Sequence, residues 1–172
     1  MEKDKFTVIR DTREQEACGW QFEESEICAG TERSMLKTGD YSLKGYEDIF
    51  IVERKRSTAE FAHNVCEKRF ENELDRLNLI KNAFIVCEFE FADLVLFPMN
   101  SSIPRHKWLH LKLTPQFLIK RLNDLQVKYP NIKFVFAGRF AQVFMEDLFK
   151  RIYYKYKYVK DKTVNSAGDF SQ

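Results

Sequence analysis

Two acidic residues and a lysine have the types and the spacing of a centre that cleaves phosphodiesters. Glu53 and Lys55 are two positions apart in the run Val52-Glu53-Arg54-Lys55, and Asp40 precedes this run. Phosphodiester hydrolysis needs charge neutralisation at the phosphate and an activated water, and a magnesium-type ion bound by one or two carboxylates supplies both. We therefore expect Asp40 and Glu53 to hold a divalent cation.

The spacing between Glu53 and Lys55 has a mechanical meaning in a β-strand. Side chains two residues apart project to the same face of a strand, and the residue between them projects to the other face. A lysine on the same face of the strand as the metal-binding Glu53 is able to orient or help deprotonate the attacking water. Lys55 is the candidate for that role, and Arg54 is expected to point away from it.

A β-hairpin is predicted to bring these residues together. Residues 41–43 and 49–52 are short β-type runs, and the connecting residues 44–48 contain the glycine and acidic residues of a turn. Two antiparallel strands joined by a short turn bring the residue before the first strand beside the end of the second. Asp40 is thereby expected near Glu53.

Further strands and helices are predicted around this hairpin. A capping box at Ser57 and Glu60 begins a helix over about 58–80, because apolar residues then recur at helical spacing. Residues 93–114, which contain Pro98 and Pro104, are expected to be irregular. The other expected elements are strands at 6–9, 31–36, 84–89 and 132–136, a helix over 115–125, and a final helix after Gly138 with Phe140, Val143, Phe144, Leu148 and Ile152 on one side.

Strands that alternate with substantial helices predict an α/β fold, in which a mixed β-sheet is flanked by helices. The early hairpin supplies antiparallel pairing, and the helical connections supply parallel pairing. We expect one domain over residues 1–158. The polar residues 159–172 are expected to form a flexible C-terminal tail.

The overall composition limits the class of protein. The chain has 172 residues, of which 44% are hydrophobic and 31% charged, which suits a single globular core. Its formal net charge of +2 predicts no general attraction to nucleic acid or to an anionic membrane, so any affinity for DNA depends on local charge. The four cysteines form no CxxC pair, the N-terminus does not resemble a signal peptide, and no apolar stretch approaches the roughly 20 residues of a membrane span. We expect an intracellular protein, in the cytoplasm, nucleoid or nucleus, without membrane contact.

Three motifs in order make the pattern more specific. They are Asp11-Thr12-Arg13-Glu14, Gly39-Asp40-Tyr41 and Val52-Glu53-Arg54-Lys55, and Arg69 follows them. This arrangement resembles the XPF-type structure-specific nuclease family, which belongs to the broad PD-(D/E)XK class with a restriction-endonuclease-like core. The resemblance extends from about Val8 to Ile152.

The resemblance implies cleavage of branched, flapped or forked DNA with Mg²⁺ or Mn²⁺ and without a small-molecule cofactor. It implies that Asp40 and Glu53 bind the metal and that Lys55 acts on water. Asp11 and Glu14 are implied as supporting catalytic acids, with Asp11 also counted among the metal ligands. Contacts to DNA phosphates, or the ordering of acids, are implied for Arg13, Arg54 and Arg69.

The chain departs from the family pattern at two positions. The family usually has Asp where this chain has Ala59, and Gln where this chain has Glu73. Glu60 is adjacent to Ala59 but is also the acid of the capping box. Loss of one supporting acid weakens metal sites about 10-fold to 100-fold, so weak activity or a preference for manganese is one hypothesis.

Several features also have simpler structural interpretations. Asp11 and Asp40, taken singly, are typical turn residues, and Arg69 and Glu73 are spaced for an ordinary helical ion pair. His106 and His110 have the spacing of metal ligands on a helix, but nothing nearby completes a zinc set, and a structural or surface role is favoured. The aromatic and basic run at 153–158 could stack the bases of single-stranded DNA, although we favour a role in packing the last helix against a partner.

Two other functions compete with a structure-specific nuclease. One is a catalytically weak or silent DNA-binding or scaffold subunit of the same fold, and the other is a restriction-like or mismatch-directed nuclease. The intact set of Asp40, Glu53 and Lys55 argues against a silent subunit. DNA is the expected partner, and the apolar side of the last helix suits either the core or a homodimer or heterodimer.

Overall fold

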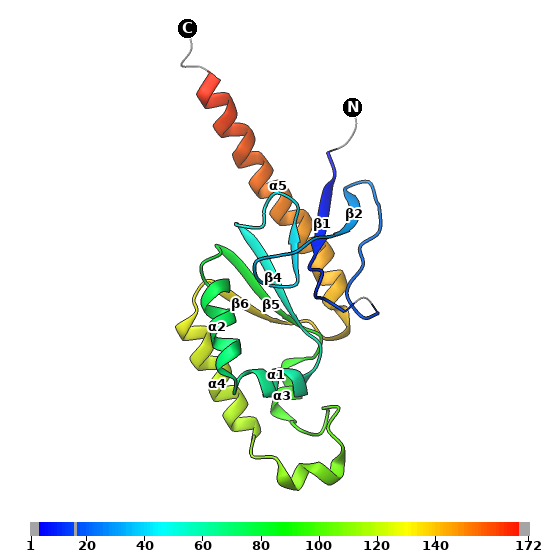
Figure 1. Ribbon diagram of the computed structural model, residues 1–172, viewed down its shortest axis with the longest axis vertical. Helices are drawn as coiled ribbons and strands as arrows, with labels where there is room; N and C mark the ends of the chain where they lie inside the picture. The colour runs from blue at the N-terminus through cyan, green and yellow to red at the C-terminus, as the bar shows by residue number, and fades with distance from the viewer. Residues whose placement is uncertain (1–3, 16, 169–172) are drawn as a thin grey trace.

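A computed structural model describes residues 4–15 and 17–168, with side chains through residue 158. A six-stranded sheet with the order β2-β1-β3-β4-β5-β6 forms the centre of the molecule (Figure 1). Strand β3 runs antiparallel to both of its neighbours, and the other neighbouring strands are parallel. The strands are β1 (Phe6–Arg10), β2 (Cys28–Arg33), β3 (Tyr41–Leu43), β4 (Phe50–Lys55), β5 (Asn82–Cys87) and β6 (Ile132–Phe136). The predicted mixed sheet is confirmed.

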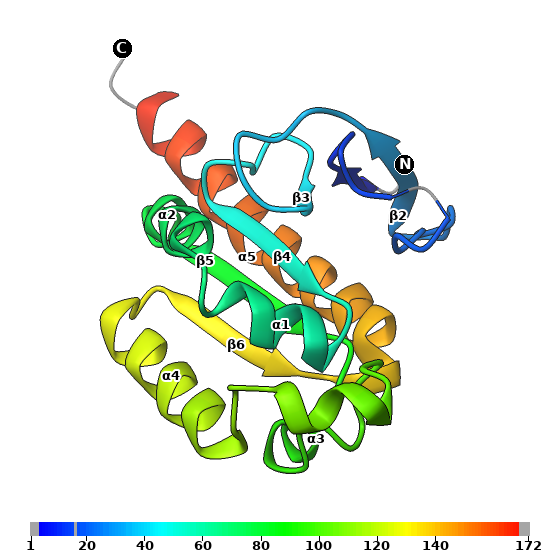
Figure 2. The ribbon, with the colours of Figure 1, turned by 60° about the horizontal axis from the view of Figure 1, so that its bottom comes forward.

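Helices cover both faces of this sheet. Helices α1 (Thr58–Asn64), α2 (Lys68–Leu77) and α4 (Pro115–Lys128) pack on one face, and α5 (Ala141–Gly168) packs on the other (Figure 2). The alternation of side chains along β4 explains the two cores. Ile51 belongs to the core under α1, α2 and α4, whereas Phe50 and Val52 belong to the core under α5. The face on which a β4 residue lies therefore decides which layer it contacts.

The hairpin predicted around Asp40 is present. Strands β3 and β4 are antiparallel, with Tyr41 opposite Val52. The register of β3 against β1 places Tyr41 opposite Arg10, which ends β1. The residues that follow β1, precede β3 and end β4 are thus brought to the same end of the sheet.

The single helix predicted over 58–80 is wrong, because the structure has two. Helix α1 ends at the cap residue Val65, and Glu67 has extended backbone angles (φ −99°, ψ 134°) before α2 begins. The break lets Phe61 of α1 and Phe70 of α2 both enter the same core. No glycine or proline marks residues 65–67, so the apolar periodicity alone did not reveal the change of direction.

The later elements follow the prediction more closely. Helix α4 and strand β6 are confirmed, and the irregular excursion contains α3 (Phe91–Val95) and the short 3₁₀ helix η1 (Arg105–His110). His106 and His110 are exposed on η1, in line with the surface role favoured for them. A second 3₁₀ turn, η2 (Gly138–Phe140), precedes α5.

The buried side of α5 differs from the side that was predicted. Phe140, Val143 and Phe144 are 58%, 64% and 37% exposed. Of the predicted side, only Ile152 is buried and Leu148 packs against the core partly buried. The other residues that α5 buries in the core are Ala141, Met145, Phe149, Tyr153 and Tyr156. The prediction erred because apolar residues lie on more than one side of this helix. Helix α5 also continues through Gly168, beyond the boundary expected at 158, and residues 169–172 of the expected tail lie outside the described part.

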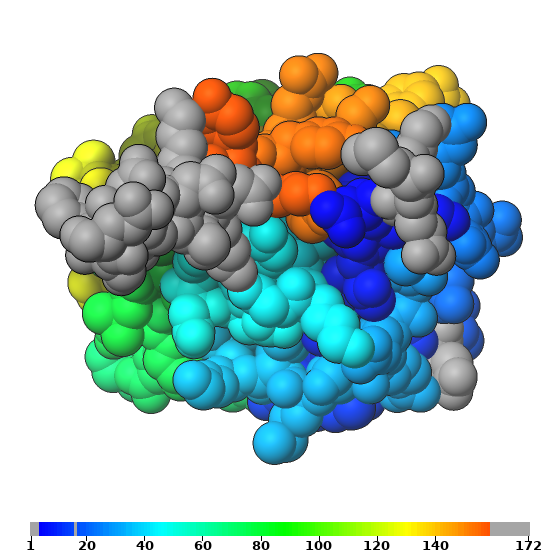
Figure 3. All heavy atoms as spheres, turned by 90° about the horizontal axis from the view of Figure 1, so that it is seen from above, coloured from blue at the N-terminus to red at the C-terminus, as the bar shows by residue number. Residues whose placement is uncertain are grey.

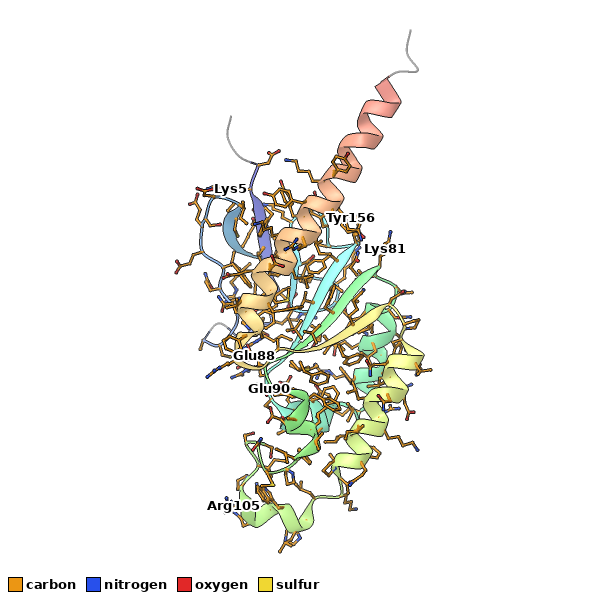
Figure 4. All side chains as sticks on the ribbon, turned by 180° about the vertical axis from the view of Figure 1, so that it is seen from behind. Lys5, Lys81, Glu88, Glu90, Arg105 and Tyr156 are labelled. Atoms are coloured by element: carbon orange, nitrogen blue, oxygen red, sulfur yellow. The ribbon has the colours of Figure 1, made fainter. Side chains whose placement is uncertain are left out.

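The aromatic run near the end of α5 packs against the chain's own sheet. The rings of Phe6 and Tyr153 have centroids 5.5 Å apart, and α5 lies directly beside β1 when the molecule is seen from above (Figure 3). Asn82 donates a 2.7 Å hydrogen bond to the hydroxyl of Tyr156, which lies beside Lys81 at one end of the sheet (Figure 4). Tyr153 and Tyr156 therefore pack within this chain and not against a partner as predicted. None of the helices in the described part is both long and apolar enough to cross a membrane.

Candidate active site

Asp40 is fixed in place by the backbone of β4. Its own N–H donates to the carbonyl oxygen of Val52 at 2.8 Å, and the N–H of Arg54 donates to Asp40 Oδ2 at 2.7 Å. Gly39 makes this approach feasible, because its φ of +74° suits glycine and a Cβ there would lie 2.6 Å from Ile51 Cγ1. The Gly-Asp pair of the sequence motif therefore has a steric reason.

Glu53 and Lys55 lie on the same face of β4, as their spacing predicts. Both side chains are buried, and Lys55 Nζ donates to Glu53 Oε1 at 2.7 Å. Lys55 Nζ is also 3.9 Å from Glu73 Oε2 on α2 and lies 4.9 Å from the ring centre of Phe70. Lys55 thus links the acid on the sheet to an acid on the helix above it.

Asp40, Glu53 and Lys55 line one cleft of about 290 Å³ between the sheet and the helices α1 and α2. The cleft is strongly polar, with acidic and basic side chains together. Its full lining is Asp11, Arg13, Lys37, Thr38, Gly39, Asp40, Glu53, Lys55, Glu60, Asn64, Glu67, Arg69, Phe70, Glu73 and Arg76. The hairpin and the carboxyl end of β4 therefore deliver the predicted reactive residues to a common space.

Of the acids in the cleft, Asp40 and Glu53 are poised to bind positive charge. Burial raises the pKa of Asp40 to about 7, although the hydrogen bond from the Arg54 N–H opposes the rise. Burial and the neighbouring charge of Asp40 raise the pKa of Glu53 well above its usual range, against the attraction of Lys55. Two buried acids that resist simultaneous ionisation favour a nearby cation, because the cation relieves the repulsion between them.

Lys55 is held in its charged form. Burial lowers the pKa of Lys55, but the charges of Glu53 and Glu73 outweigh that effect and hold the pKa above its ordinary value. A lysine that stays protonated at neutral pH does not accept a proton from water. Of the two roles expected for Lys55, orientation and charge stabilisation fit this geometry better than deprotonation.

Asp11 organises the loop beside the acid pair. Asp11 Oδ1 accepts from the N–H and Nε of Arg13, and Oδ2 accepts from Arg13 Nη2 and from the N–H of Leu36. Burial raises the pKa of Asp11, but these hydrogen bonds more than offset it and the pKa is lowered. Both oxygens are engaged, so a metal-ligand role for Asp11 requires Arg13 to move and stays a prediction. Arg13 itself is largely exposed at the edge of the cleft.

Arg54 lies on the face of β4 opposite to the cleft. Its side chain is 4% exposed and forms ion pairs with Glu14 and Glu88, while its guanidinium stacks over the ring of Trp20 at 5.4 Å. Trp20 Nε1 also donates to Glu88. The expected DNA contact by Arg54 is therefore wrong, because its guanidinium is enclosed by protein. The alternative expectation, that it orders acids, fits.

Glu14 has a supporting position and does not line the cleft. Its carboxylate binds Arg54 Nη1, on the side of β4 that faces away from Glu53. Glu88 is the acid that sequence reasoning missed, and it lies directly after β5 at the end of the sheet (Figure 4). A signal for it existed, because an acid directly after a buried parallel strand lies at the edge where Asp11 and Glu53 also lie.

The helical residues of the motif divide between the cleft and other roles. Arg69 is exposed and lines the cleft, and the ion pair considered between Arg69 and Glu73 is not formed. Half of the capping box predicted at Ser57 and Glu60 is present, because Ser57 Oγ accepts from the N–H of Glu60. The Glu60 carboxylate accepts from the N–H of Arg56 and not from that of Ser57, so the reciprocal bond of the box is not formed. Glu60 also lines the cleft, whereas Ala59 does not.

The acid pair fits a magnesium-type ion. No group of three or more His, Cys, Asp or Glu side chains among the described residues forms a complete metal-binding set. Magnesium does not require such a set, since it keeps several waters and is held by one or two carboxylates together with substrate phosphates. No hydrogen bond from the described residues reaches Asp40 Oδ1 or Glu53 Oε2. These two oxygens are therefore free to bind a metal ion.

Comparison with known proteins identifies the fold and the family. The model of the ERCC4 domain matches residues 10–144. The structure of XPF from Aeropyrum pernix matches with a TM-score of 0.59 and 19% identity, over 96% of this chain and 74% of that one. XPF from Aeropyrum pernix in complex with DNA matches with a TM-score of 0.55 and 21% identity, over 87% of this chain and 65% of that one. These likenesses confirm the restriction-endonuclease-like core that was predicted. No curated protein matches the sequence closely enough to add to them.

Proposed function

Because the chain belongs to the ERCC4 domain family of XPF-type nuclease domains, we propose that it is a Mg²⁺- or Mn²⁺-dependent endonuclease for branched, flapped or forked DNA. The family predicted from the three sequence motifs is thereby confirmed. One observation carries the proposal of activity: the half-buried Asp40 and the buried Glu53 lie together beside the charged Lys55 in a cleft lined by further cations. Such an enzyme acts inside the cell, where its DNA lies.

The proposed roles follow from the contacts of each side chain. Asp40 and Glu53 would hold the cation, which when bound neutralises phosphate charge and lowers the pKa of water. Lys55 faces the cleft as a fixed positive charge, so it stabilises negative charge on the reacting phosphate. Arg13 and Arg69 stand at the exposed edge of the cleft, where they are able to contact phosphates.

DNA is the proposed substrate class on three grounds. The chain belongs to a nuclease family, shares its fold with a solved XPF that binds DNA, and has cations around an acidic centre. The preference for branched DNA rests on the family alone. A panel of labelled flap, fork, junction, mismatch and duplex substrates with Mg²⁺ or Mn²⁺ tests this preference directly. We expect cleavage at branches to exceed cleavage of the plain duplex.

Two substitutions test the proposed site. Asp40→Asn and Glu53→Gln keep the shape of each side chain but remove its charge, and each should abolish cleavage. Asp124→Asn is the matched control, because Asp124 is an exposed acid on α4 outside the cleft. Absence of cleavage by the unaltered protein on every substrate contradicts the enzymatic proposal.

A silent DNA-binding subunit is the alternative with an observation in its favour. Both oxygens of Asp11 are occupied, and no complete three-residue ligand set exists in the described part of the chain. Such a subunit would bind the same branched DNA, but Mn²⁺ would neither stabilise it nor activate it. Binding without cleavage by the protein at saturating Mn²⁺ would favour this alternative.

Pairing with a second subunit is proposed through the start of α5. Phe140, Val143 and Phe144 expose apolar surface there, and exposed apolar patches mark interaction sites. A homodimer or heterodimer would cover these side chains. Light scattering gives the molar mass of the unaltered protein and of the Phe140→Ser variant in solution. A dimer mass for the unaltered protein and a monomer mass for the variant support the pairing. The same mass for both proteins opposes a homodimer at this surface.

A further inference from the structure

Helix α2 presents two arginines to the cleft, one on each side of an acid. Arg69, Glu73 and Arg76 all line the cleft, and their spacing of four and three residues places them on one side of the helix. Arg69 and Arg76 are both exposed. They form a stripe in which an acid separates two cations.

The acid of this stripe does not neutralise its neighbours. Glu73 approaches Lys55 on the sheet, at 3.9 Å from Nζ. No ion pair or side-chain hydrogen bond joins Arg69 or Arg76 to another residue in the described ranges. The other arginine of the cleft, Arg13, pairs with an acid, and so do Arg121 of α4 and Arg151 of α5. Arg69 and Arg76 therefore keep their donors available for an anionic ligand.

The spacing of the two arginines suits a nucleic-acid backbone. Seven residues of α-helix rise about 10.5 Å, which is the length of about three steps of 3.4 Å along a strand. Glu73 lies between the two arginines on α2, and it approaches Lys55, which pairs with Glu53 of the acid pair. A strand that contacted both arginines would consequently pass over the reaction centre.

The loop opposite the end of α2 adds a further cation. Lys37 lines the cleft together with Arg76. Its ion pair with Asp48, at 3.6 Å, joins side chains that are 93% and 88% exposed, and such exposed pairs contribute little. Lys37 is therefore able to turn toward a ligand in the cleft that Arg76 also lines.

We propose that α2 binds one DNA strand on both sides of the phosphate to be cleaved, with Arg69 on one side and Arg76 on the other. The inference rests on the proposed function and adds a requirement to it. The substrate strand must continue past the reaction centre in both directions, so cleavage is internal and a strand end is a poor substrate. Arg76 is thereby assigned as a DNA-binding residue. Glu73 faces Lys55, so it leaves the guanidinium groups of Arg69 and Arg76 free to bind phosphates.

Salt dependence of DNA binding tests the two contacts without any need for cleavage. Affinity for a labelled fork is measured in EDTA over a series of salt concentrations, for the unaltered protein, Arg69→Gln and Arg76→Gln. Each lost phosphate contact should reduce the slope of log K against log salt by about 0.7 to 0.9. Lys120→Gln is the matched control, because Lys120 is an exposed cation on α4 outside the cleft, and its slope should not change.

A positional measurement identifies the two sides of the strand. One phosphate at a time is replaced by an uncharged methylphosphonate along the strand that is cleaved. Binding should weaken at two linkages about three steps apart, and Arg76→Gln should abolish the effect at one of them only. Sensitive linkages confined to one side of the cleavage point, or slopes equal to that of the control, would overturn the inference. Cleavage with unchanged slopes removes this inference and leaves the proposed function. Reduced slopes without cleavage keep Arg69 and Arg76 as DNA contacts but remove the proposed function, and with it the placement of these contacts around a cleaved phosphate.

Discussion

The backbone N–H of Arg54 holds Asp40 Oδ2 at 2.7 Å, while the Arg54 side chain is buried on the far face of β4 with Glu14 and Glu88. One residue of the strand thus joins the acid of the cleft to an ion-paired network outside it. Glu53 and Lys55, the residues on either side of Arg54, point into the cleft. The motif therefore combines two reactive side chains with a buried anchor between them.

Replacement of the buried Arg54 side chain should lower the free energy of unfolding without removing a DNA contact. Arg54→Leu leaves Glu14 and Glu88 without their shared cation, and breaking a buried pair in this way costs about 3 kcal/mol or more. Urea denaturation measures the loss in free energy of unfolding. The slope of DNA affinity against salt should stay unchanged at concentrations where the variant is folded, and a slope reduced by about 0.9 would restore Arg54 as a phosphate contact.

Gly39 should tolerate substitution less well than Gly45. Both glycines have positive φ, at +74° and +80°, so alanine strains the backbone at either position. A Cβ at Gly39 also meets Ile51 at 2.6 Å, whereas nothing lies within 4 Å of one at Gly45. We expect Gly39→Ala to lose about 1 to 3 kcal/mol more than Gly45→Ala, measured by urea denaturation. Equal losses would show that the steric argument fails.

Asp40→Asn should stabilise the metal-free protein at alkaline pH. The pKa of Asp40 is raised to about 7 in the folded chain from an ordinary value of 3.8. The folded state therefore keeps a proton that the unfolded chain has lost, and stability falls as pH rises between about 4 and about 7. Asparagine escapes that loss, so a gain of roughly 1 kcal/mol at pH 8 should raise Tm by about 2 to 4 °C.

Thermal denaturation in EDTA at pH 4 and pH 8 measures the Asp40→Asn effect. The difference between the variant and the unaltered protein should be larger at pH 8 than at pH 4. Asp124→Asn serves as the control, because Asp124 is exposed. A variant that is destabilised equally at both pH values would mean that burial of the Asp40 charge has no cost.

Ala59→Asp should change cleavage by less than about twofold. The family usually has an acid at this position, and loss of a supporting acid commonly costs about 10-fold to 100-fold. Ala59 does not line the cleft, however, while Glu60 does. Initial rates at saturating Mn²⁺ measure the effect, and a rise of 10-fold or more would show that the missing acid limits the enzyme.

The sequence predicted the parts of the site that follow from local periodicity. The alternation of Glu53, Arg54 and Lys55 and the hairpin before them depend on neighbouring residues, and both were predicted correctly. The break between α1 and α2 depends on how Phe61 and Phe70 reach a shared core, and no local residue signals it. Long-range contacts escaped prediction for the same reason.

The assignments of individual side chains show the same division. Arg54 pairs with Glu88, which is distant in the chain. The sequence does not reveal this partner, so Arg54 was predicted to contact DNA. The buried side of α5 could not be chosen from composition, because Phe140 and Phe144 are as apolar as Phe149. Only the position of the sheet decides which of these side chains is covered.

The central claim is that Asp40 and Glu53 hold the cation that cleavage requires. The rate of cleavage of a labelled fork as a function of Mn²⁺ concentration tests it, with the unaltered protein, Glu53→Gln and the control Asp124→Asn. We predict saturation for the unaltered protein and the control, and a loss of more than about 100-fold for Glu53→Gln, because loss of a direct ligand should exceed the outer-shell range. Equal rates for Glu53→Gln and the unaltered protein would contradict the claim.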